Sequence, residues 1–228
     1  MEHAAGVPQI SNLKSQILMQ LIAATTFGLE AVVSRELKQL GYEQQTTEDG
    51  KVTFEADAAA IARTNLWLRS AERVLIQVGQ FEAFDFGELF DSTNALPWEE
   101  WLPENAYFPV RGRSVRSQLH SVPDCQAIVK KAVVERLKQR YHKVWFSEDG
   151  PTFAIEVALL KDRATLTIDT TGPGLHKRGY RKRVGEAPLK ETLAAAMIQL
   201  SYWNSRRLLL DPFCGSGTIP IEAALLGR

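Results

Sequence analysis

The spacing of apolar and polar residues predicts six elements in the first eighty positions of the chain. Glu48-Asp49-Gly50 is a turn signal between two short strand patterns, and Asp57 stands where its side chain can cap a helix. The predicted ranges are a strand at 20–25, a helix at 28–40, strands at 42–45 and 51–55, a helix from 57 to about 70, and a strand at 74–81. This order is that of a split βαβ arrangement.

A second mixed pattern follows, up to about residue 170. The long helix within it has apolar residues at every fourth position, namely Val129, Val133, Leu137 and Tyr141. The predicted ranges are a partly helical stretch at 85–104, a strand at 107–115, a helix at 123–141, and a hairpin of strands at 153–160 and 164–169. Thr171-Gly172-Pro173-Gly174 is then the clearest break in the chain.

The last forty residues predict two helices with a strand between them. Pro188 begins a helix whose inward-facing side chains are expected to be Leu189, Leu193, Met197 and Leu200. Leu208 to Leu210 is an apolar run typical of a buried parallel strand, and it is followed by Gly215-Ser216-Gly217 and an apolar helix at 218–226. A strand, a glycine turn and a helix N-terminus form the ligand-binding corner of a doubly wound α/β sheet.

The composition is that of an ordinary globular protein of 228 residues, 45% hydrophobic and 24% charged. No apolar run is long enough to span a bilayer, and the N-terminus lacks the basic and apolar regions of a secretory signal. The two cysteines exclude a disulfide framework and suit a reducing compartment, so we expect a cytoplasmic protein. The four histidines are scattered and give no metal-binding spacing.

A net charge of zero hides a separation of charge along the chain. Residues 1–110 hold 7 Lys and Arg against 16 Asp and Glu, a net of −9, whereas residues 111–143 hold 9 against 2, a net of +7. A second basic run lies at 176–183, where Tyr180 could stack on a base. Such blocks favour contact with a polyanion, and a solvated face is the alternative for any single residue. The candidate RNA contacts are Arg111, Arg113, Arg116, Lys130, Lys131, Lys138, Lys177, Arg178 and Arg181.

The segment most indicative of function is Asp211-Pro212-Phe213-Cys214-Gly215-Ser216-Gly217-Thr218. It lacks the lysine of a Walker loop and the spacing of a nucleophile elbow, and Pro220 stands where a dinucleotide-binding loop needs glycine. The octet resembles motif I of class I S-adenosylmethionine-dependent methyltransferases. In that family the glycines bend the backbone around the methionine part of the cofactor. The helix N-terminus receives the carboxylate of that part, and the acid accepts a hydrogen bond from its ammonium group.

The resemblance makes all eight residues candidate cofactor contacts: Asp211, Pro212, Phe213, Cys214, Gly215, Ser216, Gly217 and Thr218. The run 186–196 looks like the helix that packs beside motif I in THUMP-linked methyltransferases, which adds Lys190 and Glu191 as lining candidates. Cys214 could be a catalytic thiolate, but it has no His or Lys nearby in the sequence to activate it, so a small pocket-lining residue is favoured. Ser216 is expected to cap the turn or the following helix.

Residues 110–119 and 123–133 resemble the THUMP RNA-binding module, and that resemblance covers about 45–170. The whole chain is similar to bacterial THUMP-containing RNA methyltransferases. The expected fold is an α+β region, ferredoxin-like plus THUMP, followed by the first strand and helix of a truncated, Rossmann-like α/β methyltransferase domain. The expected parts are a disordered lead-in at 1–18, a ferredoxin-like part at 19–84, a THUMP part at 85–170, a basic linker at 171–187 and the start of the methyltransferase domain at 188–228.

The most similar type of enzyme implies transfer of a methyl group from S-adenosylmethionine to the exocyclic N2 amine of a guanine in 23S ribosomal RNA. A transfer RNA guanine is the alternative target, and neither a membrane nor a metal is expected. The family's ribose-binding acid and its Asn/Asp-Pro-Pro-Tyr/Phe motif are absent, so no catalytic residue is assigned. We therefore expect an N-terminal fragment that is inactive alone. A non-catalytic RNA-binding module and a DNA adenine methyltransferase are the rival interpretations.

Overall fold

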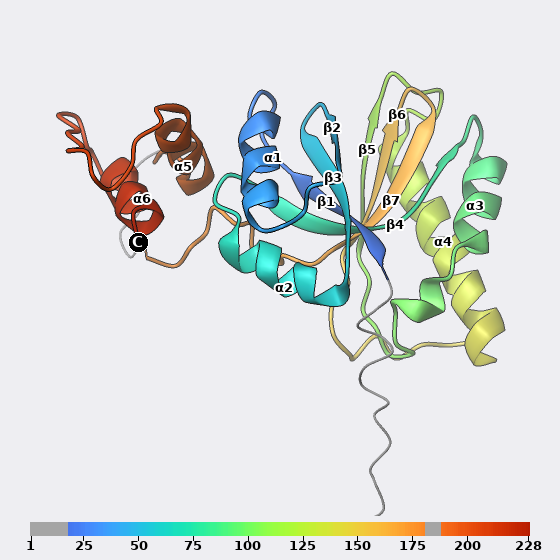
Figure 1. The fold of residues 1–228 in the computed structure, drawn as a ribbon. Helices are drawn as coiled ribbons and strands as arrows, with labels where there is room; N and C mark the ends of the chain where they lie inside the picture. The colour runs from blue at the N-terminus through green and yellow to red at the C-terminus, as the bar shows by residue number, and fades with distance from the viewer. Residues whose placement is uncertain (1–17, 181–187) are drawn as a thin grey trace, which may run out of the picture. The chain divides into compact units, whose positions relative to one another are not determined.

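The computed structural model describes residues 18–180 and 188–228 (Figure 1). Its contacts divide the chain into two compact units, one formed by Met1–Glu72 with Leu175–Arg228 and the other by Arg73–Gly174. Most of the predicted lead-in and part of the predicted basic linker, including Arg181, lie outside the described residues. Among the residues that are described, no helix combines the length and the apolar composition needed to cross a bilayer.

The first unit begins with three antiparallel strands in the order β2-β3-β1. These strands are β1 (Met19–Ala24), β2 (Gln45–Glu48) and β3 (Lys51–Ala56). Leu21 of β1 lies opposite Phe54 of β3, and both side chains are buried. The turn between β2 and β3 includes Gly50 at a φ of +74°, which confirms the hairpin predicted from the sequence.

Two helices pack in this part, α1 (Glu30–Gln39) and α2 (Ala58–Trp67). Val32, Val33 and Leu37 of α1 are buried, as the apolar spacing predicts. Asp57 caps α2, because its carboxylate accepts a hydrogen bond from the Ala60 N–H at 3.0 Å. Both helices are therefore set by signals that are local in the sequence.

The strand predicted at 42–45 is wrong in its range, since β2 begins only at Gln45. Gly41 has a φ of +93°, and the Tyr42 N–H donates to the Leu37 carbonyl at 3.0 Å. These are the features of a glycine-terminated helix end. The end of α1 thus occupies residues that the apolar pattern assigns to a strand.

The second unit holds a four-stranded sheet in the order β4-β7-β6-β5. Its strands are β4 (Arg73–Glu82), β5 (Val110–Val115), β6 (Ile155–Leu160) and β7 (Arg163–Asp169). β5 and β6 run parallel, and the other neighbours run antiparallel. Lys161 and Asp162, both with positive φ, form the two-residue turn of the predicted β6–β7 hairpin.

The helices of the second unit lie on one side of its sheet (Figure 1). They are α3 (Phe86–Ala95), the 3₁₀ turn η3 (Trp98–Glu100) and α4 (Val122–Tyr141). Three of the four predicted stripe residues on α4 are fully buried, and Tyr141 is half-buried. Gly112 of β5 allows α4 to approach, because an added Cβ would lie only 3.1 Å from side-chain atoms of Val122 and Gln126.

The first unit also contains α5 (Glu191–Leu200) and α6 (Thr218–Leu226), which pack against each other. The prediction for α5 is wrong in its start, since the helix begins at Glu191 and not at Pro188, so that Leu189 precedes it. It is also wrong for two residues of the inward face, since Met197 and Leu200 are exposed. The alanines at 194–196 and Ile198 are buried in their place. Small side chains let neighbouring helices approach closely, so α5 buries its alanine face.

The strand predicted at Leu208 to Leu210 does not form. The side chains of Leu208 and Leu210 are 94% and 84% exposed. A parallel strand is held by hydrogen bonds to neighbouring strands, and the described residues of this chain supply no such neighbour. The apolar run therefore remains an irregular connection to the turn before α6.

Candidate cofactor-binding site

The segment predicted to bind the cofactor, Asp211 to Thr218, forms a tight turn directly before α6. The Asp211 carboxylate accepts a hydrogen bond from the Phe213 N–H at 3.1 Å, and the Gly217 N–H donates to the Cys214 carbonyl at 2.7 Å. Gly215 and Gly217 have φ values of +52° and +76°. Residues that carry a Cβ atom are strained at positive φ, so the turn depends on both glycines.

The first turn of α6 has no side-chain cap. Gly217 occupies the N-cap position, and the Ser216 hydroxyl lies 3.2 Å from the Thr218 hydroxyl. Of the two roles expected of Ser216, the helix cap is wrong, because Gly217 takes the capping position, and the role in the turn stays a prediction. An uncapped helix N-terminus can receive an anionic group such as a carboxylate.

Most side chains of this turn point into solvent, with Phe213 93% exposed. The Cys214 sulfur is also exposed and lies 4.0 Å from the Gly215 carbonyl. Lys190 pairs with Glu72, its Nζ 3.5 Å from Oε1, and Glu191 is buried at the start of α5. These contacts do not test the cofactor role of Lys190 and Glu191, which stays a prediction.

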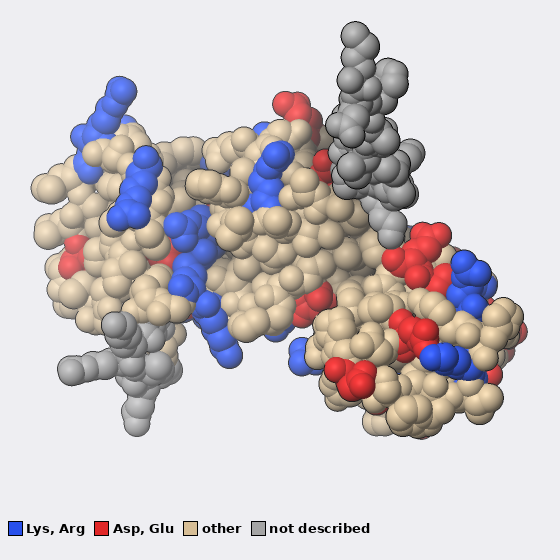
Figure 2. All heavy atoms as spheres, turned by 90° about the horizontal axis from the view of Figure 1, so that it is seen from below, with Lys and Arg blue, Asp and Glu red and all other residues tan. Residues whose placement is uncertain are grey.

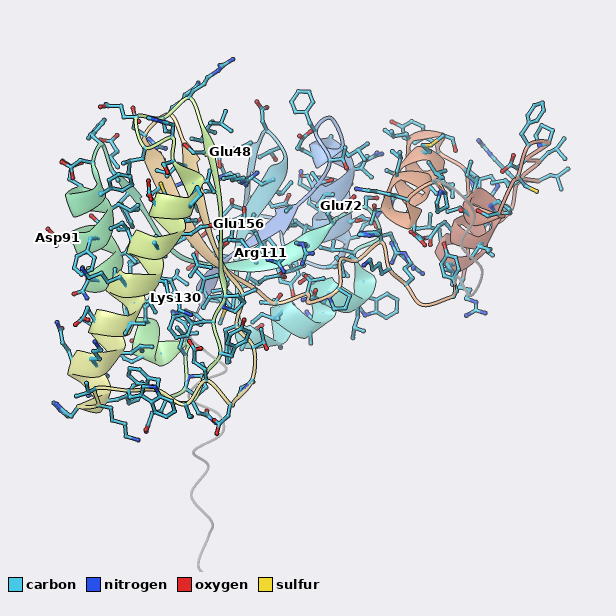
Figure 3. All side chains as sticks on the ribbon, turned by 180° about the vertical axis from the view of Figure 1, so that it is seen from behind. Glu48, Glu72, Asp91, Arg111, Lys130 and Glu156 are labelled. Atoms are coloured by element: carbon cyan, nitrogen blue, oxygen red, sulfur yellow. The ribbon has the colours of Figure 1, made fainter. Side chains whose placement is uncertain are left out.

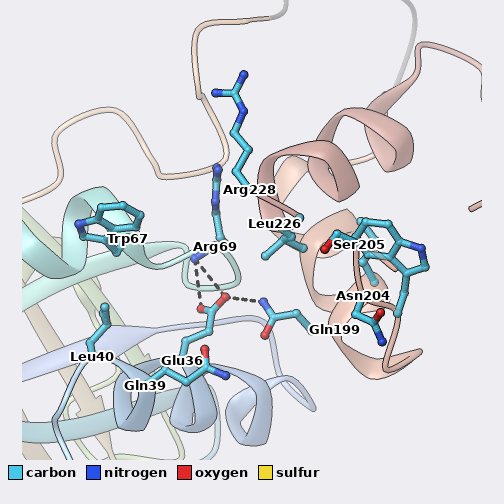
Figure 4. A pocket seen from close by; sticks show the side chains of 13 residues that line it. Glu36, Gln39, Leu40, Trp67, Arg69, Gln199, Asn204, Ser205, Leu226 and Arg228 are labelled. Atoms are coloured by element: carbon cyan, nitrogen blue, oxygen red, sulfur yellow. Dashed lines mark hydrogen bonds between the residues drawn. The ribbon is translucent and has the colours of Figure 1, made fainter. Parts of the chain in front are cut away.

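Glu36 of α1 is a buried carboxylate that the sequence prediction missed (Figure 4). It accepts hydrogen bonds from the backbone N–H groups of Arg69 and Ser70, each at 3.1 Å, and from the Ser70 hydroxyl at 3.3 Å. The side-chain amide of Gln199 on α5 is a further donor. Burial raises the pKa of Glu36, and these hydrogen bonds oppose that rise. The signal in the sequence is a charge at a helical spacing shared with Val32 and Leu40.

A cavity of about 400 Å³ lies beside Glu36 (Figure 4). Its lining includes Trp67, Arg69 and Gln199, and it also includes Leu226 near the end of α6. A helix of nine residues is about 13 Å long, and the predicted cofactor turn precedes the opposite end of α6. The cavity and the cofactor turn are therefore distinct places in the first unit.

Two of the residues predicted to contact RNA lie before the undescribed part of the basic linker. Lys177 is exposed, as an RNA contact requires. The side chain of Arg178 is only 11% exposed, and its Nε lies 3.1 Å from the buried carboxylate of Glu222. The RNA role of Arg178 stays a prediction, and the structure gives its guanidinium a protein partner.

Five of the nine basic residues at 111–143 form ion pairs with acidic side chains. The pairs are Arg113–Glu156, Lys130–Glu148, Arg136–Glu99, Lys138–Glu135 and Lys143–Glu104. Figure 3 labels Arg111, Lys130 and Glu156 in the second unit, and Figure 2 shows acidic side chains among the basic ones on the face that it presents. The charge of +7 counted along the sequence is therefore partly neutralised in the fold.

The remaining basic residues of this block form no ion pair in the described part of the chain, although the charge of Arg140 adds to the hydrogen bond from Arg136 in lowering the pKa of Glu99. They are Arg111, Arg116, Lys131 and Arg140. Arg111 lies on β5 opposite Glu156 in register, and Lys131 lies 5.8 Å from the ring centre of Phe90. These four cations are the ones that remain available to phosphate groups.

Three family models match the chain in succession. Residues 20–75 match the RlmL ferredoxin-like domain, residues 83–169 the THUMP domain, and residues 178–228 the RMKL-like methyltransferase domain. Among curated proteins, "Putative RNA methyltransferase YpsC" of Bacillus subtilis (strain 168) is 56% identical over 210 residues, which are 91% of this chain and 54% of that protein. "Putative RNA methyltransferase slr0064" of Synechocystis is 35% identical over 204 residues, 89% of this chain and 53% of that protein.

Solved structures show the same fold. A protein of Listeria monocytogenes, described as a "predicted N6-adenine-specific DNA methylase", has a TM-score of 0.91 and 56% identity over 94% of this chain and 57% of its own. SMU.472, described as "a putative methyltransferase complexed with SAH", has a TM-score of 0.87 and 49% identity over 92% of this chain and 56% of its own. TrmN from Thermus thermophilus has a TM-score of 0.69 and 26% identity, covering 92% and 63%.

In its fold and in the order of these matches, the chain is similar to the THUMP-containing methyltransferases. It carries their RlmL-type ferredoxin-like domain, their THUMP domain and the first part of an RMKL-like methyltransferase domain. The chain spans about half the length of the curated relatives it matches, 54% and 53%.

The raised pKa of Glu36 leads to a prediction for stability against pH. A carboxyl whose pKa is higher in the folded than in the unfolded chain contributes stability that is fully present below the unfolded value, 4.5 for an ordinary Glu. That stability is lost as the pH rises through the folded value. We therefore expect the stability advantage of the wild type over Glu36→Gln, measured by urea denaturation, to shrink between pH 4.5 and pH 7.5. Glu43→Gln, at an exposed position, is the control. An advantage that stays constant or grows with pH would contradict this account.

Proposed function

We propose that the protein is an RNA methyltransferase that uses S-adenosylmethionine, and that residues 1–228 provide RNA contacts and the first part of the cofactor site. The observation that carries this proposal is the turn at Asp211–Thr218, where two glycines with positive φ lead into an uncapped helix. The turn lies in the segment that matches a methyltransferase domain, and the related SMU.472 was solved in complex with SAH. Its two cysteines are both free, which suits a reducing compartment, so the proposed location is the cytoplasm.

The turn fits the amino-acid end of this cofactor. An added Cβ would lie 3.9 Å from its nearest atom at Gly215 and 3.7 Å at Gly217, which are ordinary contacts, so the glycines are required by their φ values and not by a lack of space. The uncapped start of α6 would hold the carboxylate of the cofactor, and Asp211 would accept a hydrogen bond from its ammonium group. The bound cofactor supplies a reactive methyl group. The residues of this chain bind and orient it.

For the target we propose the exocyclic N2 amine of a guanine in 23S ribosomal RNA, with a transfer RNA guanine as the alternative. The THUMP match at 83–169 and the RNA methyltransferase names of two relatives support RNA. The Listeria relative is described as a DNA methylase, so DNA has to be tested as well. We assign no catalytic residue within residues 1–228 and expect these residues alone to transfer no methyl group.

Identification of the methylated nucleotide tests the target directly. We expect the full-length protein to methylate guanine N2 in 23S ribosomal RNA from cells that lack its gene, as read by mass spectrometry of nucleosides. Transfer RNA and duplex DNA with adenine-containing sites are the competing substrates. Methylation of adenine in DNA, with none in RNA, would overturn the RNA assignment.

Gly217→Val in the full-length protein tests the cofactor turn. A β-branched residue at a φ of +76° is strained by about 1–3 kcal/mol, so S-adenosylmethionine affinity should fall by about five- to a hundredfold. RNA affinity should stay within about twofold, because the RNA contacts are assigned to other residues. Calorimetric titration measures the first and filter binding the second.

Gly172→Val is the matched control for Gly217→Val, since Gly172 also has a positive φ, +66°, and no atom within 4 Å of an added Cβ. We expect it to bind the cofactor as the wild type does. If Gly217→Val binds the cofactor as tightly as this control, the turn is not part of the site.

If the basic side chains without an ion pair contact RNA phosphates, the removal of each should make RNA binding less dependent on salt. Arg111→Gln, Arg116→Gln and Lys131→Gln should each weaken binding and reduce the slope of log K against log salt by about 0.7–0.9. Lys138→Gln is the control, because Lys138 already pairs with Glu135 at 2.9 Å and should change the slope less. Equal slopes in all four variants would show that RNA binds elsewhere.

A further inference from the structure

Glu222 is a fully buried carboxylate on α6, with 0% of its side chain exposed. The Arg178 Nε lies 3.1 Å from its Oε1, and the Tyr180 hydroxyl donates a hydrogen bond to the same oxygen at 2.9 Å. An Arg69 guanidinium nitrogen lies 3.8 Å from Oε2. Groups from three parts of the first unit thus meet at one side chain: the end of α2, the segment before α5, and α6.

Two nitrogens of the Arg178 guanidinium, Nε and Nη2, have partners in this cluster. Besides facing Glu222, it donates a hydrogen bond to the Arg69 backbone carbonyl. Burial lowers the pKa of Arg178, and the charge of Glu222 opposes that change. Both charges are largely shielded from solvent, with 11% of the Arg178 side chain and none of the Glu222 side chain exposed, so each depends on the other for compensation.

The position of Glu222 relates this cluster to the cofactor turn. Glu222 follows Thr218, the first residue of α6, by four positions, so both residues lie on one face of the helix, and both are buried. The turn itself contains Gly215 and Gly217, which do not stiffen the backbone. The direction of the first turn of α6 must therefore be set by contacts that the side chains of the helix make. Among these contacts, Glu222 makes the ion pairs with Arg178 and Arg69.

We propose that Glu222 is a positioning residue for the cofactor turn, and that Arg178 and Tyr180 act through it. By holding α6 against Arg69 and the segment that enters the methyltransferase part, Glu222 sets where the Gly215–Thr218 backbone meets the cofactor. The inference deepens the proposed function and rests on it. It also gives Arg178 and Tyr180 a role that differs from the RNA contacts expected of them from the sequence.

The first test measures the backbone and needs no cofactor. Glu222→Gln keeps the shape of the side chain and removes the charge that Arg178 faces. In hydrogen–deuterium exchange of the 228-residue chain, we expect faster exchange at residues 211–218 in this variant and unchanged exchange in β1 and β3. Tyr180→Phe removes one hydroxyl and should produce a smaller change at the same residues. Lys177→Gln, an exposed neighbour of Arg178, is the control and should exchange as the wild type does.

The second test measures ligand affinity in the full-length protein. Glu222→Gln should raise the Kd for S-adenosylmethionine about tenfold, with RNA affinity within about twofold. Removing both charges in Glu222→Gln/Arg178→Met should recover most of the lost cofactor affinity, because no buried charge is then left alone. A purely structural role would lower the melting temperature of Glu222→Gln and leave the Kd at 20 °C unchanged.

The outcomes separate this inference from the proposed function. Unchanged exchange at 211–218 together with an unchanged cofactor Kd in both Glu222→Gln and Tyr180→Phe overturns the positioning role. If the wild-type full-length protein binds no S-adenosylmethionine, the proposed function fails, and the cofactor role of Glu222 fails with it. Faster exchange in the variants would then still show that Glu222 orders the turn. If Glu222→Gln does not fold, Tyr180→Phe decides the question, since it removes a single hydroxyl from the cluster.

Discussion

Two buried carboxylates, Glu36 and Glu222, hold the first unit together. A buried carboxylate is costly unless its charge is compensated, and here the compensating groups come from distant parts of the chain, although Oε2 of Glu222 has only Arg69 at 3.8 Å and no hydrogen bond. Glu36 and its partner Gln199 are 163 positions apart. Arg69 lies near both carboxylates, offering its backbone N–H to Glu36 and its guanidinium to Glu222. These contacts explain why residues 175–228 form one unit with residues 1–72, although about a hundred residues separate them.

The division into two units separates the parts that the proposed activity needs. The THUMP match at 83–169 lies within the second unit, and the candidate cofactor turn lies in the first. The chain passes between these units near Glu72 and again near Gly174. The later of these passages leads to Arg178 and Tyr180, which contact α6 through Glu222. The described start of this connection is therefore held to α6 by the side chains of Arg178 and Tyr180.

Charge counted along the sequence overstated the basic surface of the second unit. Residues 111–143 carry nine Lys and Arg, and five of these face carboxylates, most of them from outside that block, such as Glu99, Glu104 and Glu156. No count within a window can include partners that folding brings from elsewhere. The same limit applies to Arg178, which belongs to a basic run in the sequence and to an ion pair in the structure.

The sequence by itself determined the features that depend on neighbouring residues: the capped start of α2, the hairpin turns at Gly50 and at Lys161–Asp162, the apolar stripe of α4, and the glycine turn before α6. Only the tertiary structure decided which face of α5 is buried, which cations are neutralised, and that Leu208 to Leu210 is not a strand. Those outcomes depend on partners far away in the chain or on neighbouring strands. The pattern of neighbouring residues indicates which secondary structure a segment can form. The contacts of that segment with distant parts of the chain decide whether this structure is stable.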